Sequence, residues 1–329
     1  QIACVMLLLV VMLILIEGRL RGQRRFALPV RQPRALSRVP LTGRAALAAS
    51  LACALPVLVG AVLPIGFLAV EVLRRDLWQQ ADAALLRSLA NAVALSGLAA
   101  GIVVALGIGI GCARRQGREP WLPALSRLAS LGYAVPGTVL ALGLLVPLAG
   151  FDNILANAAA RWFGFNPGLL LMGSGAALVL AYVVRFLAIA VSGVESGLSR
   201  ISPRIDDAAR TLGASAPEVL RRMHWPLARP AIAAAALLVF VDCLKELPAT
   251  LLLRPLNVDT LATTVYGHAS RGSFEDGALA GLLIVLAGLY PAIRLARAGG
   301  RRGSPAREIA GFGLTGARDW RWCGEGGAG

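Results

Sequence analysis

The sequence predicts an all-α polytopic membrane protein. Of its 329 residues, 57% are hydrophobic and only 16% are charged. A water-soluble chain of this length needs more charge to cover its surface. The apolar residues fall in long runs, and arginine-bearing loops separate these runs along the chain. A helix needs about 20 apolar residues to cross the hydrocarbon core of a bilayer, and most of the runs reach that length.

The predicted spans follow one another with loops between them. We expect membrane helices at roughly 1–16, 45–70, 90–112, 128–150, 168–191, 230–253 and 278–298. The first run lacks an initiator methionine, and positive charges follow it rather than precede it, unlike in a signal peptide. We interpret it as the end of a truncated helix that precedes the main bundle. The tail 299–329 has no helical or strand period and is expected to be disordered.

Basic residues alternate between rich and poor loops. The loops on one side of this scheme carry 25 of the 33 Lys and Arg residues, and those on the other side carry six. Cytoplasmic loops of membrane proteins hold the excess of positive charge, so the loop 192–229 and the C-terminus are predicted to be cytoplasmic. This distribution accounts for most of the net charge of +15 without a nucleic-acid partner.

Several small residues recur in the third apolar run. They are Gly97, Gly101, Gly107, Gly109 and Gly111. Small residues let membrane helices approach closely, so we expect helix packing here rather than a nucleotide-binding loop. A Walker A loop requires Gly-Lys before Ser or Thr, whereas the only lysine, Lys245, follows a leucine. In the fourth run, Pro136 and Gly137 predict a kinked helix, at either a translocation pathway or a packing interface.

Signals for covalent chemistry and for metals are weak. The five cysteines include no CxxC pair, and the chain has two histidines, so neither a disulfide framework nor a metal site is predicted. No nucleophile–base pair lies in or beside the apolar runs. The sequence therefore favours a transport or structural role over an enzyme, with no cofactor bound by this chain.

The loop between the fifth and sixth runs is predicted to contain a first short helix. Ser202 suits the N-cap, Pro203 suits the first helical position, and Gly213 suits the position just beyond the end. The apolar residues between them share one narrow face: Ile205, Ala208, Ala209 and Leu212.

A second short helix is predicted to follow. Ser215 and Glu218 have the spacing of a capping box, and Pro226 is expected to end the helix. Its apolar side holds Val219, Leu220 and Met223. Two interpretations stay open. The helices could lie on anionic lipid as amphipathic helices, or they could form a rigid docking element for another protein. Their short length and small apolar faces favour docking.

The spacing in this loop resembles the EAA loop of binding-protein-dependent ABC importer permeases. Ala208, Ala209, Gly213 and Pro226 match the family pattern, with Asp207 in the place of its Glu, Met223 of its Ile and Trp225 of its Leu. The resemblance implies that the loop docks on a cytoplasmic ABC ATPase dimer, which binds ATP and Mg²⁺. The loop residues that we expect to take part in docking are Asp207, Ala208, Ala209, Gly213, Glu218, Leu220, Met223 and Pro226.

The resemblance extends over residues 45–298 and implies the type I ABC importer transmembrane fold. The string LKELPATLLLRPLNVDTLATTVY is similar to the ferric-iron branch, in which one chain carries two permease modules. Residues 1–44 would then be the last helix and linker of a preceding module. The resemblance also implies a bacterial inner membrane location, a periplasmic binding protein, and a preceding module or second permease copy as partners. Alternative cargoes are thiamine, a polyamine, a phosphonate or another anion, and a less favoured alternative is an ATP-independent secondary carrier.

Three charged residues lie inside the predicted span 230–253. Asp242, Lys245 and Glu246 fall on one face at helical spacing, and Lys245 can pair with either acid. Charges in a membrane are expensive and mark functional sites by default, so we predict a translocation pathway or gate here, with helix-to-helix pairing as the alternative. Pro248 predicts a break in the helix. Arg185 is expected to extend toward the headgroups.

Overall fold

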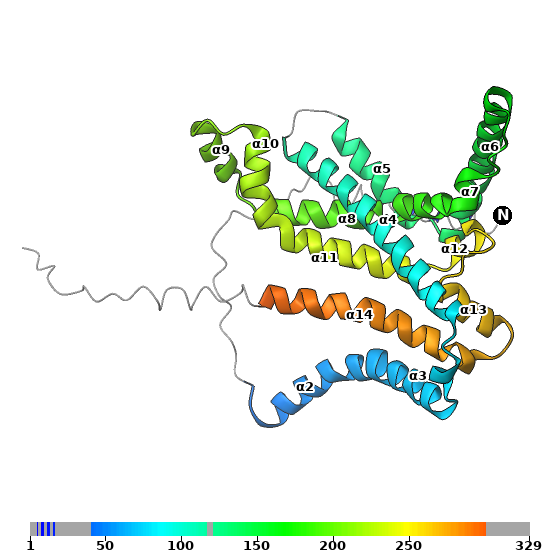
Figure 1. The fold of residues 1–329 in the computed structure, drawn as a ribbon. Helices are drawn as coiled ribbons and strands as arrows, with labels where there is room; N and C mark the ends of the chain where they lie inside the picture. Colours follow the sequence, from blue (N-terminus) through cyan, green and yellow to red (C-terminus); the bar gives the residue numbers. More distant parts are fainter. Residues whose placement is uncertain are drawn as a thin grey trace, which may run out of the picture.

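The computed structural model describes residues 41–116 and 121–300, with isolated positions before residue 17. The expected span 1–16, most of the linker up to residue 44 and the tail beyond 300 therefore lie outside the described residues. The rest is helical, as predicted (Figure 1). Six helical stretches are long and apolar enough to cross a membrane: Gly43–Arg74, Ala83–Arg115, Gly137–Phe163, Ala176–Ser199, Pro217–Leu244 and Phe274–Arg297.

The first described span is a single rod of three segments: α2 (Gly43–Val57), the π-helical η1 (Leu58–Val62) and α3 (Leu63–Arg74). None of its most apolar window is buried within the chain. Only α3 packs on another span, α14 (Ala278–Gly300), and the two run alongside each other in Figure 1. A short 3-10 helix η2 (Leu77–Gln80) then leads into α4 (Ala83–Gln116).

The core of the bundle lies where α4, α8 (Ala176–Ser199) and α11 (Trp225–Leu244) cross. Its buried residues include Val103, Leu178, Tyr182 and Val239. Close approach depends on small residues. A Cβ atom on Gly107 would lie 2.9 Å from Ala190, and one on Gly111 would lie 2.7 Å from Val194.

These contacts confirm the predicted packing role for two of the five glycines in α4. Gly97, Gly101 and Gly109 have no atom within 4 Å of an added Cβ. Corresponding close contacts on the α8–α11 side are made by glycines that the sequence argument did not single out. A Cβ on Gly193 would lie 2.6 Å from the Cβ of Ala235.

The predicted span 128–150 is wrong, because the chain breaks where a kink was expected. Helix α5 (Leu122–Ala134) ends before Val135, whose ψ of 128° is extended, and α6 (Gly137–Phe163) begins after Pro136. Proline disfavours helical geometry at the residue before it. Helix α6 then diverges from the bundle in Figure 1.

The predicted loop 151–167 is consequently helical as far as Phe163. Asp152 lies inside α6 and is fully buried. Its carboxylate accepts the backbone N–H groups of Leu171 and Met172 at 2.8–3.0 Å. These bonds join α6 to α7 (Leu170–Ser174), a single turn that Gly175, with φ of 84°, separates from α8. Helix α8 continues to Ser199, beyond the predicted end of its span at 191.

The second half of the chain adds shorter helices at the opposite end from the long loop. After α11 come α12 (Pro248–Leu253), α13 (Leu261–Ser270) and the 3-10 helix η4 (Phe274–Gly277), before α14. The expected loop 254–277 thus contains a helix, which starts with a capping box between Thr260 and Thr263.

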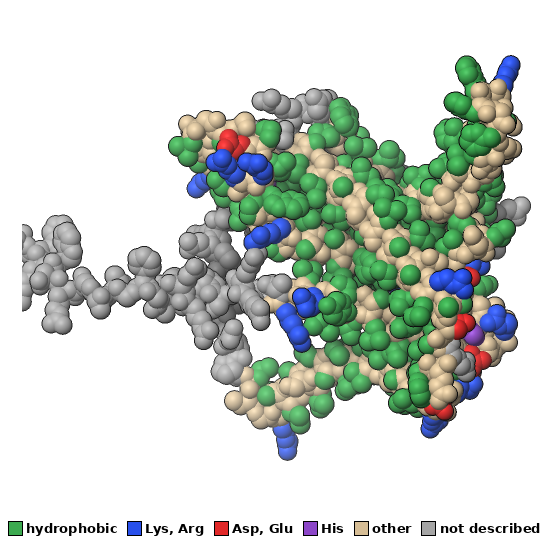
Figure 2. All heavy atoms as spheres, in the orientation of Figure 1, with side chains coloured by type: hydrophobic (Ala, Val, Ile, Leu, Met, Phe, Trp, Pro, Cys, Tyr) green, Lys and Arg blue, Asp and Glu red, His purple; other side chains and the backbone are tan. Residues whose placement is uncertain are grey.

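Charged side chains gather at the two ends of the bundle, with mainly hydrophobic side chains between them (Figure 2). At the α13 end both signs are present. There Arg75 pairs with Glu71 at 3.2 Å, with Asp276 at 3.4 Å and with Glu275 at 3.7 Å. At the other end lie α9 (Pro203–Thr211) and α10 (Ala216–Val219), beyond the tips of α8 and α11 in Figure 1.

Candidate functional site

The first helix of the 202–226 loop forms as the sequence predicts. The Ser202 hydroxyl accepts the N–H of Arg204 at 3.3 Å, and Pro203 is the first residue of α9. Gly213, just beyond the end of the helix, has φ of 81°. That backbone conformation strongly favours glycine, so Gly213 fixes the turn that brings the chain back toward the membrane.

The predicted end of the second helix at Pro226 is wrong. Helix α10 continues through the π-helical segment η3 (Leu220–His224) into α11, and the whole stretch Pro217–Leu244 is one helix. The N–H of Trp225 bonds the carbonyl of Leu220, five residues earlier. Such a widened turn re-routes the backbone bonds, so a proline without an N–H need not end the helix.

The predicted docking residues differ in their exposure. Asp207, Ala208, Gly213, Met223 and Pro226 are exposed, Glu218 and Leu220 are half-buried, and Ala209 is buried. Ala209 therefore packs inside the loop rather than facing outward. Leu212 is instead the most prominent apolar side chain of this region, at 87% exposed. Met223 and Ile205 are exposed as well, and we call these three apolar side chains of the loop the loop patch.

A polar cluster ties α9 to the membrane helices. Arg115, near the end of α4, donates from Nε to Asp206 Oδ2 at 2.9 Å. Its two Nη atoms donate to the carbonyls of Leu198 at 2.5 Å and Ile201 at 3.0 Å. The other oxygen of Asp206 lies 2.7 Å from His224 Nε2. We call Arg115, Asp206 and His224 the loop clamp.

The environment of Asp206 keeps it ionised. Burial by itself raises the pKa of its carboxyl group, but the hydrogen bonds and positive charges of Arg115 and His224 outweigh that effect and lower the pKa below its ordinary value. The clamp is therefore an ion pair at neutral pH, with the carboxylate bonded on both oxygens.

The three charged residues predicted inside the sixth run separate into two groups. Lys245 Nζ lies 2.8 Å from Asp242 Oδ1, which confirms one predicted pairing, and the lysine side chain is 65% exposed. Glu246 does not share a helix face with them, because α11 ends at Leu244 and α12 begins only at Pro248. The break predicted from Pro248 is confirmed.

Glu246 pairs with Arg185 instead. Arg185 Nε lies 3.4 Å from Glu246 Oε2, and its Nη1 donates to the carbonyl of Val135 at 2.9 Å. Both side chains are largely buried. The expected extension of Arg185 toward the headgroups is therefore wrong, since it lies mid-way along α8 and joins the break after α5 to the break after α11.

Further bonds fix this junction. The hydroxyl of Tyr182 lies 2.6 Å from Thr250 Oγ1, which donates to the carbonyl of Glu246 at 2.5 Å. Gly137 leaves space for the ion pair, because a Cβ there would lie 2.6 Å from Glu246 Oε1. Pro136 and Gly137 thus lie at a polar packing junction in the interior, one of the two settings that the sequence left open.

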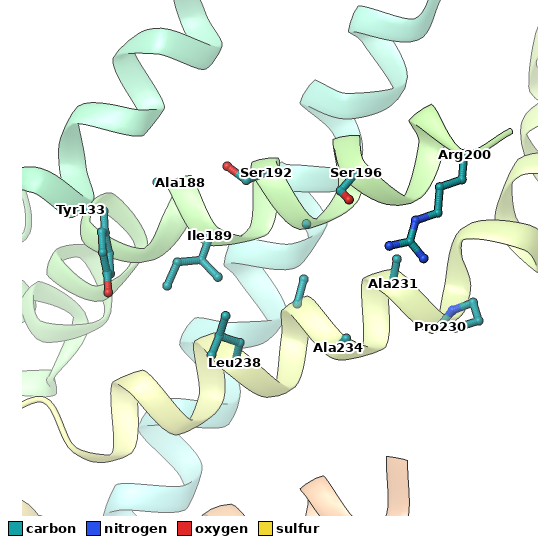
Figure 3. A pocket seen from close by; sticks show the side chains of 12 residues that line it. Tyr133, Ala188, Ile189, Ser192, Ser196, Arg200, Pro230, Ala231, Ala234 and Leu238 are labelled. Carbon is teal, nitrogen blue, oxygen red and sulfur yellow. The ribbon is translucent and has the colours of Figure 1, made fainter. Parts of the chain in front are cut away.

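A groove of about 740 Å³ runs between α8 and α11, with Tyr133 of α5 at one end and Arg200 at the other (Figure 3). Ser192 and Ser196 supply hydroxyl groups along α8, and alanines line the α11 side. Within the described ranges, no group of three or more His, Cys, Asp or Glu residues is placed to hold a metal ion.

Sequence reasoning missed the residues that hold these elements together. Arg115 was counted only as a loop charge, and Asp206 and His224 were not singled out. An acid in the first turn of α9, followed 18 positions later by a histidine, is a weak signal. No sequence period indicates that an arginine 91 positions earlier would meet that acid.

Comparison with known proteins agrees with this architecture. Residues 97–258 match the family model of the binding-protein-dependent transport system inner membrane component. The fold resembles that of a chain in the crystal structure of a bacterial alginate ABC transporter, with a TM-score of 0.59 at 16% identity, over 76% of this chain and 92% of that one.

Two relatives differ in the share of their own length that matches this chain. The chain is 29% identical over 201 residues to the Fe(3+)-transport system permease protein FbpB 2 of Haemophilus influenzae, covering 61% of this chain but 37% of that protein. It is 29% identical over 248 residues to a putative 2-aminoethylphosphonate transport system permease protein, PhnV, of Salmonella typhimurium, covering 74% of this chain and 83% of that protein. The loop and the polar junction both lie within the residues that match this family model, so this part of the chain is similar to the inner membrane components of binding-protein-dependent transport systems.

Proposed function

We propose that this permease works in an ATP-driven importer and that its loop 202–226 docks on a separate cytoplasmic ATPase dimer, which supplies the ATP and Mg²⁺ sites. The main observation in support of docking is the loop patch. Leu212, Met223 and Ile205 expose apolar surface on a helical element that lies beyond the tips of the spans. A few apolar anchors at helical spacing suit insertion into a groove of a partner protein.

Charge supports the cytoplasmic placement of this loop. Arg200, Arg204, Arg210, Arg221, Arg222 and Arg229 all lie in the loop 192–229, and cytoplasmic loops carry the excess of basic residues. A periplasmic binding protein would then deliver substrate at the opposite end, where α13 and η4 lie.

Docking is tested with Leu212→Asp and the matched control Leu256→Asp. Leu256 is fully exposed between α12 and α13, at the end of the bundle opposite the loop. We expect Leu212→Asp to lower the amount of ATPase that co-purifies with the permease at least tenfold, with unchanged membrane insertion, and the control to leave it unchanged. Retention of the ATPase by Leu212→Asp, with binding of the loop to anionic vesicles in its place, would support the lipid-surface interpretation and end the docking proposal.

We propose ferric iron as the cargo. This assignment rests on the likeness to FbpB 2, whose name states Fe(3+) transport, and on the string around Lys245. A phosphonate is the second candidate, because the match to PhnV covers 83% of that protein. Cells lacking the permease should lose ATP-dependent uptake of radiolabelled ferric iron. Loss of 2-aminoethylphosphonate uptake with iron uptake intact would transfer the assignment, and uptake driven by an ion gradient alone would indicate a secondary carrier.

We propose that Asp242, Lys245 and Glu246 mark the translocation pathway or its gate. Supporting this, the Lys245 side chain is 65% exposed and its Nζ lies 2.8 Å from Asp242 Oδ1. A charge exposed on a membrane helix requires protein or water as its neighbour. A preceding permease module or a second permease copy would cover this side of the bundle and complete the pathway.

A further inference from the structure

In the loop clamp, the polar contacts between the loop and the membrane helices centre on one guanidinium group, that of Arg115. Arg115 belongs to α4, its partner Asp206 belongs to the first turn of α9, and its other two acceptors are the carbonyls of Leu198 and Ile201. The carbonyl of Leu198 belongs to the last turn of α8, and that of Ile201 lies two residues beyond the end of this helix. One side chain therefore fixes α9 to two membrane helices at once.

The second half of the clamp reaches the other side of the loop. Asp206 uses its remaining oxygen for His224 in η3, at the base of the long helix that becomes α11. All three side chains are at most 15% exposed. The cavity beside them measures about 20 Å³, room for about one water molecule, so the cluster is a packed joint rather than a ligand site.

The loop patch and the loop clamp differ in exposure. Leu212 is 87% exposed, whereas the three side chains of the clamp are at most 15% exposed. A partner protein that displaces the loop patch would therefore transmit that displacement to the clamp without contacting the clamp residues. Arginine suits this role, because its planar fork can hold several acceptors in fixed directions.

We propose that Arg115 and Asp206 are positioning residues that transmit movement of the docked loop to α4 and α8, and that they are needed for coupling but not for docking. This inference rests on the proposed docking of the loop. The clamp acts through the membrane helices and makes no contact with ATP or with cargo.

Arg114 is a matched control in the same turn of α4. It pairs with Glu195 of α8 at 2.5 Å and is more exposed than Arg115. Its pair joins the same two membrane helices but leaves out the loop. Removing Arg114 therefore removes a comparable charge and ion pair without loosening α9.

The test uses the complete transporter, with its ATPase and binding protein, in proteoliposomes. Arg115→Ala and Asp206→Asn are compared with Arg114→Ala for co-purified ATPase, ATP hydrolysis and substrate moved per ATP. We expect both clamp variants to keep the ATPase within twofold of wild type and to lose at least tenfold in substrate per ATP. Arg115→Lys should fall between, since lysine can pair with Asp206 but cannot hold all three acceptors.

Two outcomes would overturn the inference. If the clamp variants move as much substrate per ATP as wild type, the joint does not transmit movement. If they lose the ATPase together with transport, the clamp only supports the folding of the loop. Should Arg115→Ala fail to insert, the isosteric Asp206→Asn decides. A failure of the docking proposal itself is recognised separately, because Leu212→Asp would then retain the ATPase.

Discussion

Two nearby residues at the end of α9 have different roles, since Ala209 packs inside the loop and Leu212 is available to a partner. Ala209 is buried inside the loop and Leu212 is 87% exposed, although helical periodicity places both on one apolar face. Helical periodicity identifies that face, but it does not show which of its residues are buried by other elements of the protein. An aspartate at 209 would place a charge in a packed site and disturb the loop itself, so only a change at 212 tests recognition cleanly.

Asp206 supplies a prediction about pH. Its folded pKa lies below the ordinary value, so its contribution to stability is complete above about pH 4, the ordinary aspartate value. It is lost as the pH falls through the lower folded pKa. In a His224→Gln background, where the histidine cannot titrate, we expect Asp206→Asn to lower the unfolding temperature by the same amount from pH 8 to pH 5. The difference should shrink only below about pH 4.

The measurement is thermal unfolding of the detergent-solubilised protein across that pH range. A difference that disappears between pH 7 and pH 5 would contradict the depressed pKa, and with it the strength of the Arg115 contact.

Among the helices, the positions of the two breaks were easier to predict from the sequence than the side-chain contacts that join these breaks. Pro136 and Pro248 each follow a break, because proline lacks an N–H and restricts the residue before it, although Pro147 and Pro230 lie inside helices. That Arg185 of α8 joins the two breaks depends on how three helices pack. Hydropathy places a residue along its own helix and says nothing about its neighbours across the bundle.

The junction predicts an asymmetry among variants. Arg185→Leu leaves a buried carboxylate without its partner, and breaking a buried pair in this way costs about 3–5 kcal/mol. Arg185→Leu combined with Glu246→Leu removes both charges and should cost less than Arg185→Leu alone. Thermal unfolding of the two single variants and the double variant in detergent measures the difference, and additive losses would argue that the two side chains act independently.

Helix contacts give a second prediction at this scale. Gly193→Ala would place a Cβ 2.6 Å from that of Ala235, whereas Gly101→Ala meets no atom within 4 Å. Overpacking of this kind costs about 1–3 kcal/mol. We expect Gly193→Ala to lower the unfolding temperature and Gly101→Ala to leave it unchanged. A loss of equal size in both would point to flexibility of glycine, rather than close approach, as the relevant property.

For the molecule as a whole, composition and apolar run length predicted the fold class and the number of main spans. The course of α6 could not be predicted, because its residues are apolar enough to be a span whichever neighbour they contact. Much apolar surface remains exposed on α2, α3 and α6, as expected for helices that meet lipid or another permease module. Which of these covers each helix is a property of the assembly.

Topology is testable at this scale. Leu212 and Leu256 are both highly exposed, at opposite ends of the bundle. In a background with the native cysteines replaced, an impermeant maleimide should label Leu256→Cys in right-side-out membrane vesicles. It should label Leu212→Cys only in inverted vesicles. The reverse pattern would contradict the orientation inferred from the arginine distribution.

The chain runs without a break from the loop into the fifth described span, because η3 and α11 follow α10 directly. The 20 residues of α11, from Trp225 to Leu244, span about 30 Å at 1.5 Å per residue. One end of α11 adjoins His224 of the loop clamp, and the other stops at the break before Glu246 and Pro248. A tilt of about 5° about one end displaces the other by about 3 Å over that length. This displacement is comparable with the 3.4 Å between Arg185 Nε and Glu246 Oε2, so a small rotation at one membrane surface is enough to part charges near the other.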